Sequence, residues 1–180
     1  MHNLPACPYR DDQMGQVKVF ALEENVRYLN GAEILGMPMP YRDEEIQTPI
    51  VVIAVDSSEE RRRIWEAINT MYVPPVELFI DTASGLDIIE ITAWEPGDEE
   101  KHFLPSFERE DLELPCGGRS VAYNAFTAAG LVGGIVKAYS MGQFYPSHLM
   151  IDHRTWATSL DVDYVGILAR RDADVTHPAQ

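Results

Sequence analysis

Cys116 is the residue whose surroundings most suggest chemistry. It lies in the segment Leu-Pro-Cys-Gly-Gly-Arg-Ser, directly ahead of an expected helix. A thiol at a helix N-terminus feels the positive end of the helix dipole, which favours the reactive thiolate. The adjacent glycines could leave backbone N–H groups free to hold an oxyanion, and Arg119 could add positive charge. The pattern makes Cys116 a candidate nucleophile; the alternative is a small buried cysteine at a Gly-Gly turn.

The neighbouring residues Asp152 and His153 could form half of a catalytic pair if a nucleophile such as Cys116 lay nearby. The alternative is that His153, like the other histidines, is a solvated or core side chain. No histidine pair has the helical spacing of a zinc site, so we expect no metal. No glycine-rich loop joins a strand to a helix, so we expect no phosphate-bearing cofactor either.

Several carboxylates alternate along two expected strands and could meet in a cleft as general acid and base. They are Glu77, Asp81, Asp87 and Glu90. The alternative is that they form the polar face of a half-exposed sheet. The spacing does not decide between the two readings.

A glycine-spaced segment lies inside the expected helix and consists of Ala129, Gly130, Gly133 and Gly134. Glycine inside a helix costs about 1 kcal/mol relative to alanine, so three within five positions need a reason. Small residues one turn apart let another backbone approach closely. We expect this segment to be a packing or interface site, facing either the protein's own sheet or another chain.

The elements that would position these residues predict an α+β (α/β-type) fold. It has a mixed sheet of about five strands, two main helices and an extended, Pro-rich N-terminal arm. We expect strands at residues 50–55, 76–81, 86–94, 146–151 and 164–169, and helices at 58–72 and 119–140. Ser57 and Glu60 have the spacing of a capping box at the first helix. Arg61 should begin the outer face of that helix.

The chain divides into three parts by composition. Residues 1–49 are rich in proline, which favours extended segments and turns, and contain one expected short strand at Val17–Leu22. Residues 50–171 form a single α/β-type domain, and residues 172–180 are a polar tail. Within the domain we expect a turn at Ala83–Gly85, and a turn followed by a short helix at Asp152–Leu160.

Charge sets limits on the partners. The 180 residues include 29 Asp and Glu against 14 Lys and Arg, a formal net charge of −15. Such a surface repels phosphates and anionic lipids, so we expect no direct nucleic-acid binding and no membrane association. The uncharged run Ser120–Val136 is shorter than the ~20 residues of a membrane span. With two cysteines and no visible signal peptide, we expect a cytoplasmic protein, or one assembled into a virion.

Residues 121–156 resemble the peripheral domain of tailed-phage major capsid proteins. The order is an Ala/Gly-rich helix, the apolar segment Phe144–Ile151, and a short turn, Asp152–Trp156, that ends in a tryptophan. The resemblance covers about a fifth of the chain and includes no catalytic motif. The chain is shorter than such proteins and lacks their long spine helix and extended loop. The resemblance implies a virion component.

Three hypotheses for function follow. The first is a non-enzymatic structural or assembly protein of a phage particle, which self-associates or binds another protein through the glycine-spaced segment. The second is a small cysteine-dependent enzyme with Cys116 as nucleophile. The third is an acidic protein that mimics nucleic acid and inhibits a DNA- or RNA-binding partner.

Overall fold

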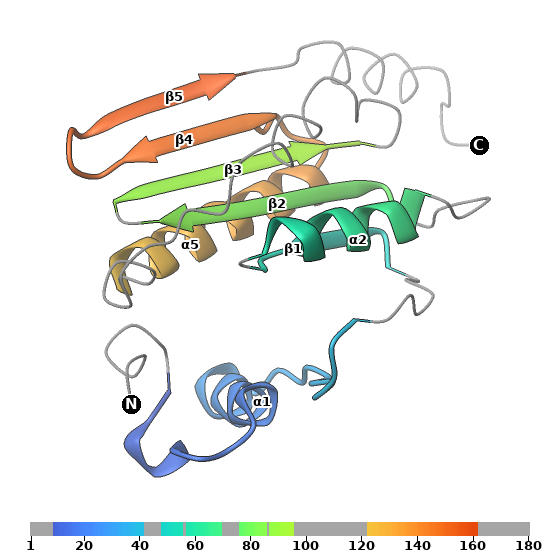
Figure 1. The fold of residues 1–180 in the computed structure, drawn as a ribbon, viewed down its shortest axis with the longest axis vertical. Coiled ribbons are helices and arrows are strands. Elements are labelled where there is room, and N and C mark those ends of the chain that lie inside the picture. Colours follow the sequence, from blue (N-terminus) through green and yellow to red (C-terminus); the bar gives the residue numbers. More distant parts are fainter. Residues whose placement is uncertain are drawn as a thin grey trace, which may run out of the picture.

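The computed structural model describes residues 9–41, 48–55, 57–69, 76–85, 87–95 and 122–161. At its centre is a five-stranded mixed sheet whose strands follow one another in chain order (Figure 1). The strands are β1 (Ile50–Ile53), β2 (Leu78–Gly85), β3 (Ile88–Trp94), β4 (His148–Asp152) and β5 (Ala157–Asp161). With helices packed on it, this sheet confirms the predicted α+β class.

The strand directions decide which side chains become neighbours. β1 and β2 are parallel, and the chain passes between them through helix α2 (Ser58–Asn69). From β2 to β5 all neighbours are antiparallel. Helix α5 (Ala122–Ser140) lies between β3 and β4 in the chain. In this register a row of directly paired residues crosses the sheet from β2 to β5. The row consists of Asp81, Thr92, His148 and Asp161.

The two helices cover opposite faces of the sheet (Figure 1). Because side chains alternate along a strand, β2 contributes to both layers. Its Leu78 and Ile80 pack in the core beneath α5, and Phe79 packs in the core beneath α2. The buried members of the α5 core are all aliphatic: Leu78, Ile80, Ile89, Ile91, Ala93, Ile135 and Leu149.

Helix α2 begins where the sequence predicts. The Glu60 N–H donates to Ser57 Oγ at 3.3 Å, which is the N-cap bond of a capping box. Trp65 packs against a buried cluster in which Phe79 and Trp94 stack with ring centroids 5.3 Å apart. The apolar side of α2 is therefore anchored by aromatic rings.

Arg61 lies on the sheet side of α2, so its predicted place on the outer face is wrong. Its Nη1 is 2.5 Å from Asp81 Oδ1, and both side chains are buried. Its Nη2 donates to the carbonyl oxygens of Val55 and Thr82. Arg61 faces the sheet because this turn of α2 crosses β2 directly above Asp81, which supplies the opposite charge.

Two predictions for the strand ends are wrong. Ala83–Gly85 is not a turn, because β2 continues through these residues and pairs with Glu90, Ile89 and Ile88. The fifth strand is β5, formed where a turn and short helix were expected. The hairpin from β4 to β5 turns at Trp156, which has a positive φ of 59°. The strand expected at residues 164–169 and the tail at 172–180 lie outside the described residues.

The strand predicted at Val17–Leu22 is also wrong, because these residues begin helix α1 (Lys18–Asn30). The helix continues through good helix formers and ends at Gly31, whose φ is +72°. Within the N-terminal segment α1 packs on a short 3₁₀ helix, η2 (Asp11–Gln13). There Gln13 and Asn25 exchange two buried side-chain hydrogen bonds. These hydrogen bonds hold η2 against α1.

Candidate functional site

The residues of the predicted cysteine site lie outside the part of the chain that the structure describes. Cys116 and Arg119 both fall between residues 95 and 122, outside the described residues. The proposed partners of Cys116, Asp152 and His153, are described. The nucleophile therefore stays a prediction, and only its partners can be placed.

Asp152 and His153 do not form a pair. Asp152 ends β4, and its Oδ1 accepts hydrogen bonds from the backbone N–H groups of Arg154 at 2.8 Å and Thr155 at 3.3 Å. A side-chain hydrogen bond from Thr155, followed by these backbone bonds, lowers the pKa of Asp152. The His153 Nε2 is buried without a hydrogen-bond partner among the described residues. Asp152 thus organises the turn of the hairpin rather than orienting an imidazole.

The structure brings together another histidine and carboxylate that the sequence did not single out as a pair. His148 Nε2 and Glu90 Oε1 lie 2.8 Å apart on neighbouring strands, on the face opposite α5. The side chains are 30% and 13% exposed respectively. A carboxylate in this position can hold the imidazole in one orientation. The pair depends on the register of β3 and β4, which no sequence pattern supplies, so only the topology could have revealed it.

The four carboxylates do not converge, so of the two readings that the spacing left open, the acid–base cleft is wrong. Asp81 is paired with Arg61, and Glu90 with His148. The other two meet tyrosines of α5. Tyr139 Oη donates to Glu77 Oε2 at 2.6 Å, and Tyr123 Oη donates to Asp87. Burial, and then the bond to Glu77, raises the pKa of Tyr139 to about 12. These carboxylates fasten elements to one another on both sides of the sheet.

The glycine-spaced segment lies on the outer face of α5, so of the two alternatives for its packing, the protein's own sheet is wrong. All its members are exposed: Ala129, Gly130, Gly133 and Gly134. A Cβ atom built on any of the three glycines meets no atom of the described residues within 4 Å. The inner face of the same helix carries buried Ile135, which packs on the sheet. The small residues therefore open toward solvent or toward another chain.

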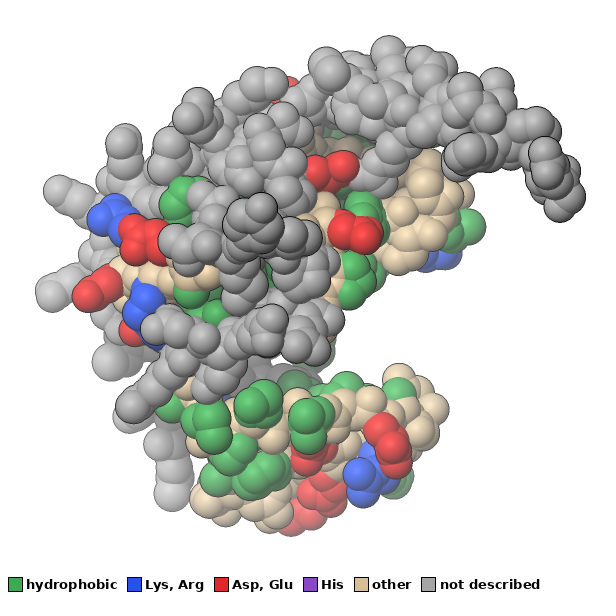
Figure 2. Space-filling model, turned by 90° about the vertical axis from the view of Figure 1, so that its right-hand side faces the viewer, with side chains coloured by type: hydrophobic (Ala, Val, Ile, Leu, Met, Phe, Trp, Pro, Cys, Tyr) green, Lys and Arg blue, Asp and Glu red, His purple; other side chains and the backbone are tan. Residues whose placement is uncertain are grey.

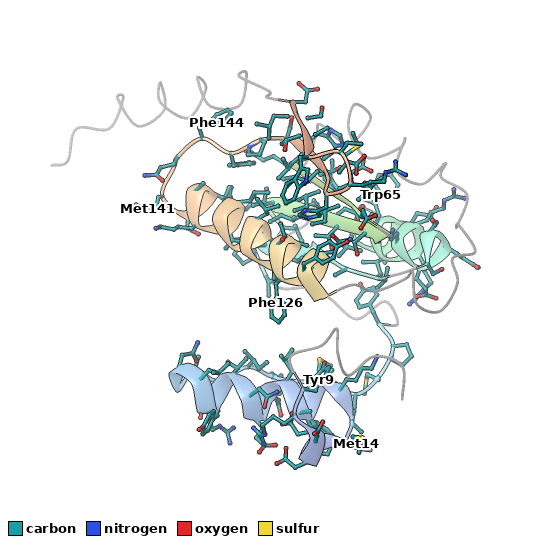
Figure 3. The ribbon with its side chains drawn as sticks, turned by 90° about the vertical axis from the view of Figure 1, so that its left-hand side faces the viewer. Tyr9, Met14, Trp65, Phe126, Met141 and Phe144 are labelled. Atoms are coloured by element: carbon teal, nitrogen blue, oxygen red, sulfur yellow. The ribbon has the colours of Figure 1, made fainter. Side chains whose placement is uncertain are left out.

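Larger apolar side chains continue this outer face. Phe126 is 61% exposed and points away from the sheet (Figure 3). With about 3.6 residues per turn, five residues fall on one stripe along the middle of the face. The stripe consists of Tyr123, Phe126, Gly130, Gly134 and Lys137. We call it the α5 stripe; Gly133 borders it, and its only charged member is Lys137.

The first turn of α5 joins this stripe to the β4–β5 hairpin. The rings of Tyr123 and His153 pack edge to face, with their centroids 5.1 Å apart. The rings of His153 and Trp156 pack in the same way, with their centroids 6.2 Å apart. Trp156 is 83% exposed. A row of aromatic rings thus continues the stripe onto the hairpin, and exposed aromatic side chains of this kind often anchor protein interfaces.

The N-terminal segment has an apolar surface of its own. Hydrophobic side chains gather on one side of it (Figure 2). Those of α1 and the following residues that are exposed include Leu22, Leu29, Leu35, Met37 and Met39. Apolar groups collected in this way mark a surface that can bind protein.

No protein-family model matches the chain, and no curated protein matches it in a sequence comparison. Among the described residues, no group of three or more His, Cys, Asp or Glu is placed to hold a metal ion. In the same segments, no helix combines the length and apolar character needed to cross a bilayer. Among the described residues, the outer face of α5, with its exposed aromatic side chains and glycines, is the best-defined candidate site.

Proposed function

We propose that the protein is a non-enzymatic structural or assembly protein that associates with other protein chains through the outer face of α5. The observation that supports this proposal is the exposed α5 stripe. It presents aromatic side chains beside bare glycine backbone, and nothing in the described part of the chain covers it. A solvent-facing helix would gain stability from alanine at these positions. Glycine is favoured where a second backbone must come close.

Charge supports the same proposal. A chain with a net charge of −15 repels its own copies and other acidic proteins over most of its surface. The α5 stripe carries a single charge, the positive one of Lys137. Association is least opposed at this face, because little repulsion has to be overcome and no charge needs to be desolvated at its centre.

The test is the mass of the protein in solution, measured by size-exclusion chromatography with light scattering. We expect the wild-type chain to form oligomers, and Phe126→Glu to shift the mass to that of a monomer by placing a charge on the stripe. The matched control is Ala125→Glu, because Ala125 is also exposed on α5 but lies off the stripe. A wild-type monomer at high concentration, with no protein partner captured, would contradict the proposal.

Within this class we propose a virion component. Support comes from the resemblance of residues 121–156 to the peripheral domain of phage capsid proteins. Negative-stain electron microscopy of the concentrated protein tests this narrower proposal. Rings, sheets or shells would support it, whereas discrete small oligomers at every concentration would count against it and leave the assembly role intact.

A further inference from the structure

The α5 stripe has an internal symmetry. Gly130 lies near the middle of the 19-residue helix, with Phe126 four residues before it and Gly134 four residues after it. Tyr123 and Lys137 lie seven residues to either side. A large side chain at one position is therefore matched by a small one, or a ring by a cation, at the mirror position.

From this pattern we infer that the partner at the α5 face is a second copy of the same chain, with the two α5 helices packed antiparallel across a twofold axis at Gly130. The inference rests on the proposed function, since it names the partner of that same face. A twofold contact is self-complementary, so each feature on one half of the stripe must fit a feature on the other half. The stripe meets this requirement at each of its positions.

Packing favours this arrangement. With Gly130 on the axis, Phe126 of each copy lies opposite Gly134 of the other. The exposed ring of Phe126 can then fill the space that the absent glycine side chain leaves. Bare backbone at Gly130 lets the two helices approach closely, as small residues do in other helix pairs.

Charge complementarity favours the antiparallel direction. The first turn of α5 holds Tyr123, which is bonded to the carboxylate of Asp87, and the last turn holds Lys137. These ends are about 21 Å apart along the helix. Antiparallel pairing brings Lys137 of each copy to the ring of Tyr123 and the carboxylate of Asp87 in the other, where a cation is attracted by both. Parallel pairing would instead place the two lysines side by side.

Disulfide trapping in the full-length chain tests the inference. Two backbones that meet at Gly130 bring its Cα atoms within the ~4.4–6.8 Å that a disulfide requires. We expect Gly130→Cys to form a covalent dimer under mild oxidation at least tenfold faster than Ala125→Cys, the exposed control on the same helix. Both residues fall in the peptide between Arg119 and Lys137, so trypsin and mass spectrometry identify the linkage despite the native cysteines.

A second pair of variants guards against a local effect of the cysteine at position 130. When Phe126→Cys and Gly134→Cys proteins are mixed and oxidised, we expect more cross-linked heterodimer than cross-linked homodimer of either variant. If the wild-type chain is oligomeric but neither experiment shows the preferred linkage, the twofold pairing is wrong and the assembly function stands. If the wild-type chain is a monomer at high concentration, the twofold pairing is wrong; if it also captures no protein partner, the proposed function is wrong as well.

Discussion

The two helices that cover the sheet are held in place by different kinds of contact. α5 lies on a layer of buried aliphatic side chains, and tyrosines near its two ends donate hydrogen bonds to Glu77 and Asp87 beside the strands. α2 has a buried charged contact in its first turn, where Arg61 meets Asp81 and two backbone carbonyls. A buried ion pair demands one geometry, whereas an aliphatic layer is specified mainly by shape.

This contrast bears on function. Within the stripe, Phe126 is exposed and the glycines meet no atom of the described residues, so these residues are not what holds the helix on the sheet. The glycines there lower helix stability, and no contact with them in the described part of the chain offsets this loss. The side of the sheet that depends on apolar burial is thus also the side that offers a free surface.

The largest effect should come from breaking the ion pair beneath α2. Asp81→Ala leaves Arg61 charged, buried and without this partner, and should lower the free energy of unfolding by about 4 kcal/mol. Urea denaturation measures the change. The control is Glu60→Ala, which removes the half-exposed pair with Arg63 and should cost less than about 1 kcal/mol. Equal losses in the two variants would show that burial does not distinguish these pairs.

The next largest effect is expected when substitutions on the two faces of α5 are compared. Ile135→Ala opens a cavity in the buried layer and should cost about 3 kcal/mol in a denaturation experiment. Phe126→Ala, on the outer face, should change the stability of the dilute monomer by less than about 0.5 kcal/mol. The same change should weaken self-association. If Phe126→Ala proved as costly as Ile135→Ala in the monomer, the outer face would already be packed within one chain.

A smaller effect, of opposite sign, is expected at the glycines. Gly134→Ala should raise the stability of the dilute monomer by about 1 kcal/mol, because alanine is the better helix former and its Cβ meets nothing nearby. It should also reduce the oligomeric fraction at high concentration. A loss of monomer stability would mean that the position is crowded within the chain.

The smallest effect concerns a tyrosine near the end of α5. The pKa of Tyr139 is raised to about 12, so folding favours its neutral form. The hydrogen bond of the neutral hydroxyl to Glu77 contributes about 0.5 kcal/mol to the free energy of unfolding. That stabilisation is fully present below pH ~10 and is lost as the pH rises through 12. Tyr139→Phe should therefore be slightly less stable than wild type near neutral pH, and the difference should shrink at alkaline pH. A difference independent of pH would exclude the hydroxyl as its source.

The sequence predicts the elements whose apolar pattern is strong. The β-branched run of β1, the capped amphipathic helix α2 and the uncharged helix α5 lie close to their expected positions. α1 was missed because Val17–Leu22 resembles a strand when read without the helix-forming residues that follow. β5 was missed because its residues are all exposed and show no apolar alternation.

Contacts between distant elements could not be predicted. The pairs Arg61–Asp81 and Glu90–His148 depend on which strands are neighbours and in what register, and local pattern contains neither. The glycine-spaced segment was recognised as unusual from its composition alone. Its direction, outward rather than toward the sheet, depends on which side of α5 carries the larger aliphatic residues.

The edge strand β5 has a consequence for strand pairing. Both of its faces are exposed, so sliding it along β4 by one residue would move no apolar side chain out of a core. Its alignment must instead be fixed at the two ends of the hairpin. One is the tight turn at Trp156, and the other is the pair of hydrogen bonds that Ser147 donates to the Asp161 carbonyl. Loosening either end should let the strand pair in more than one alignment.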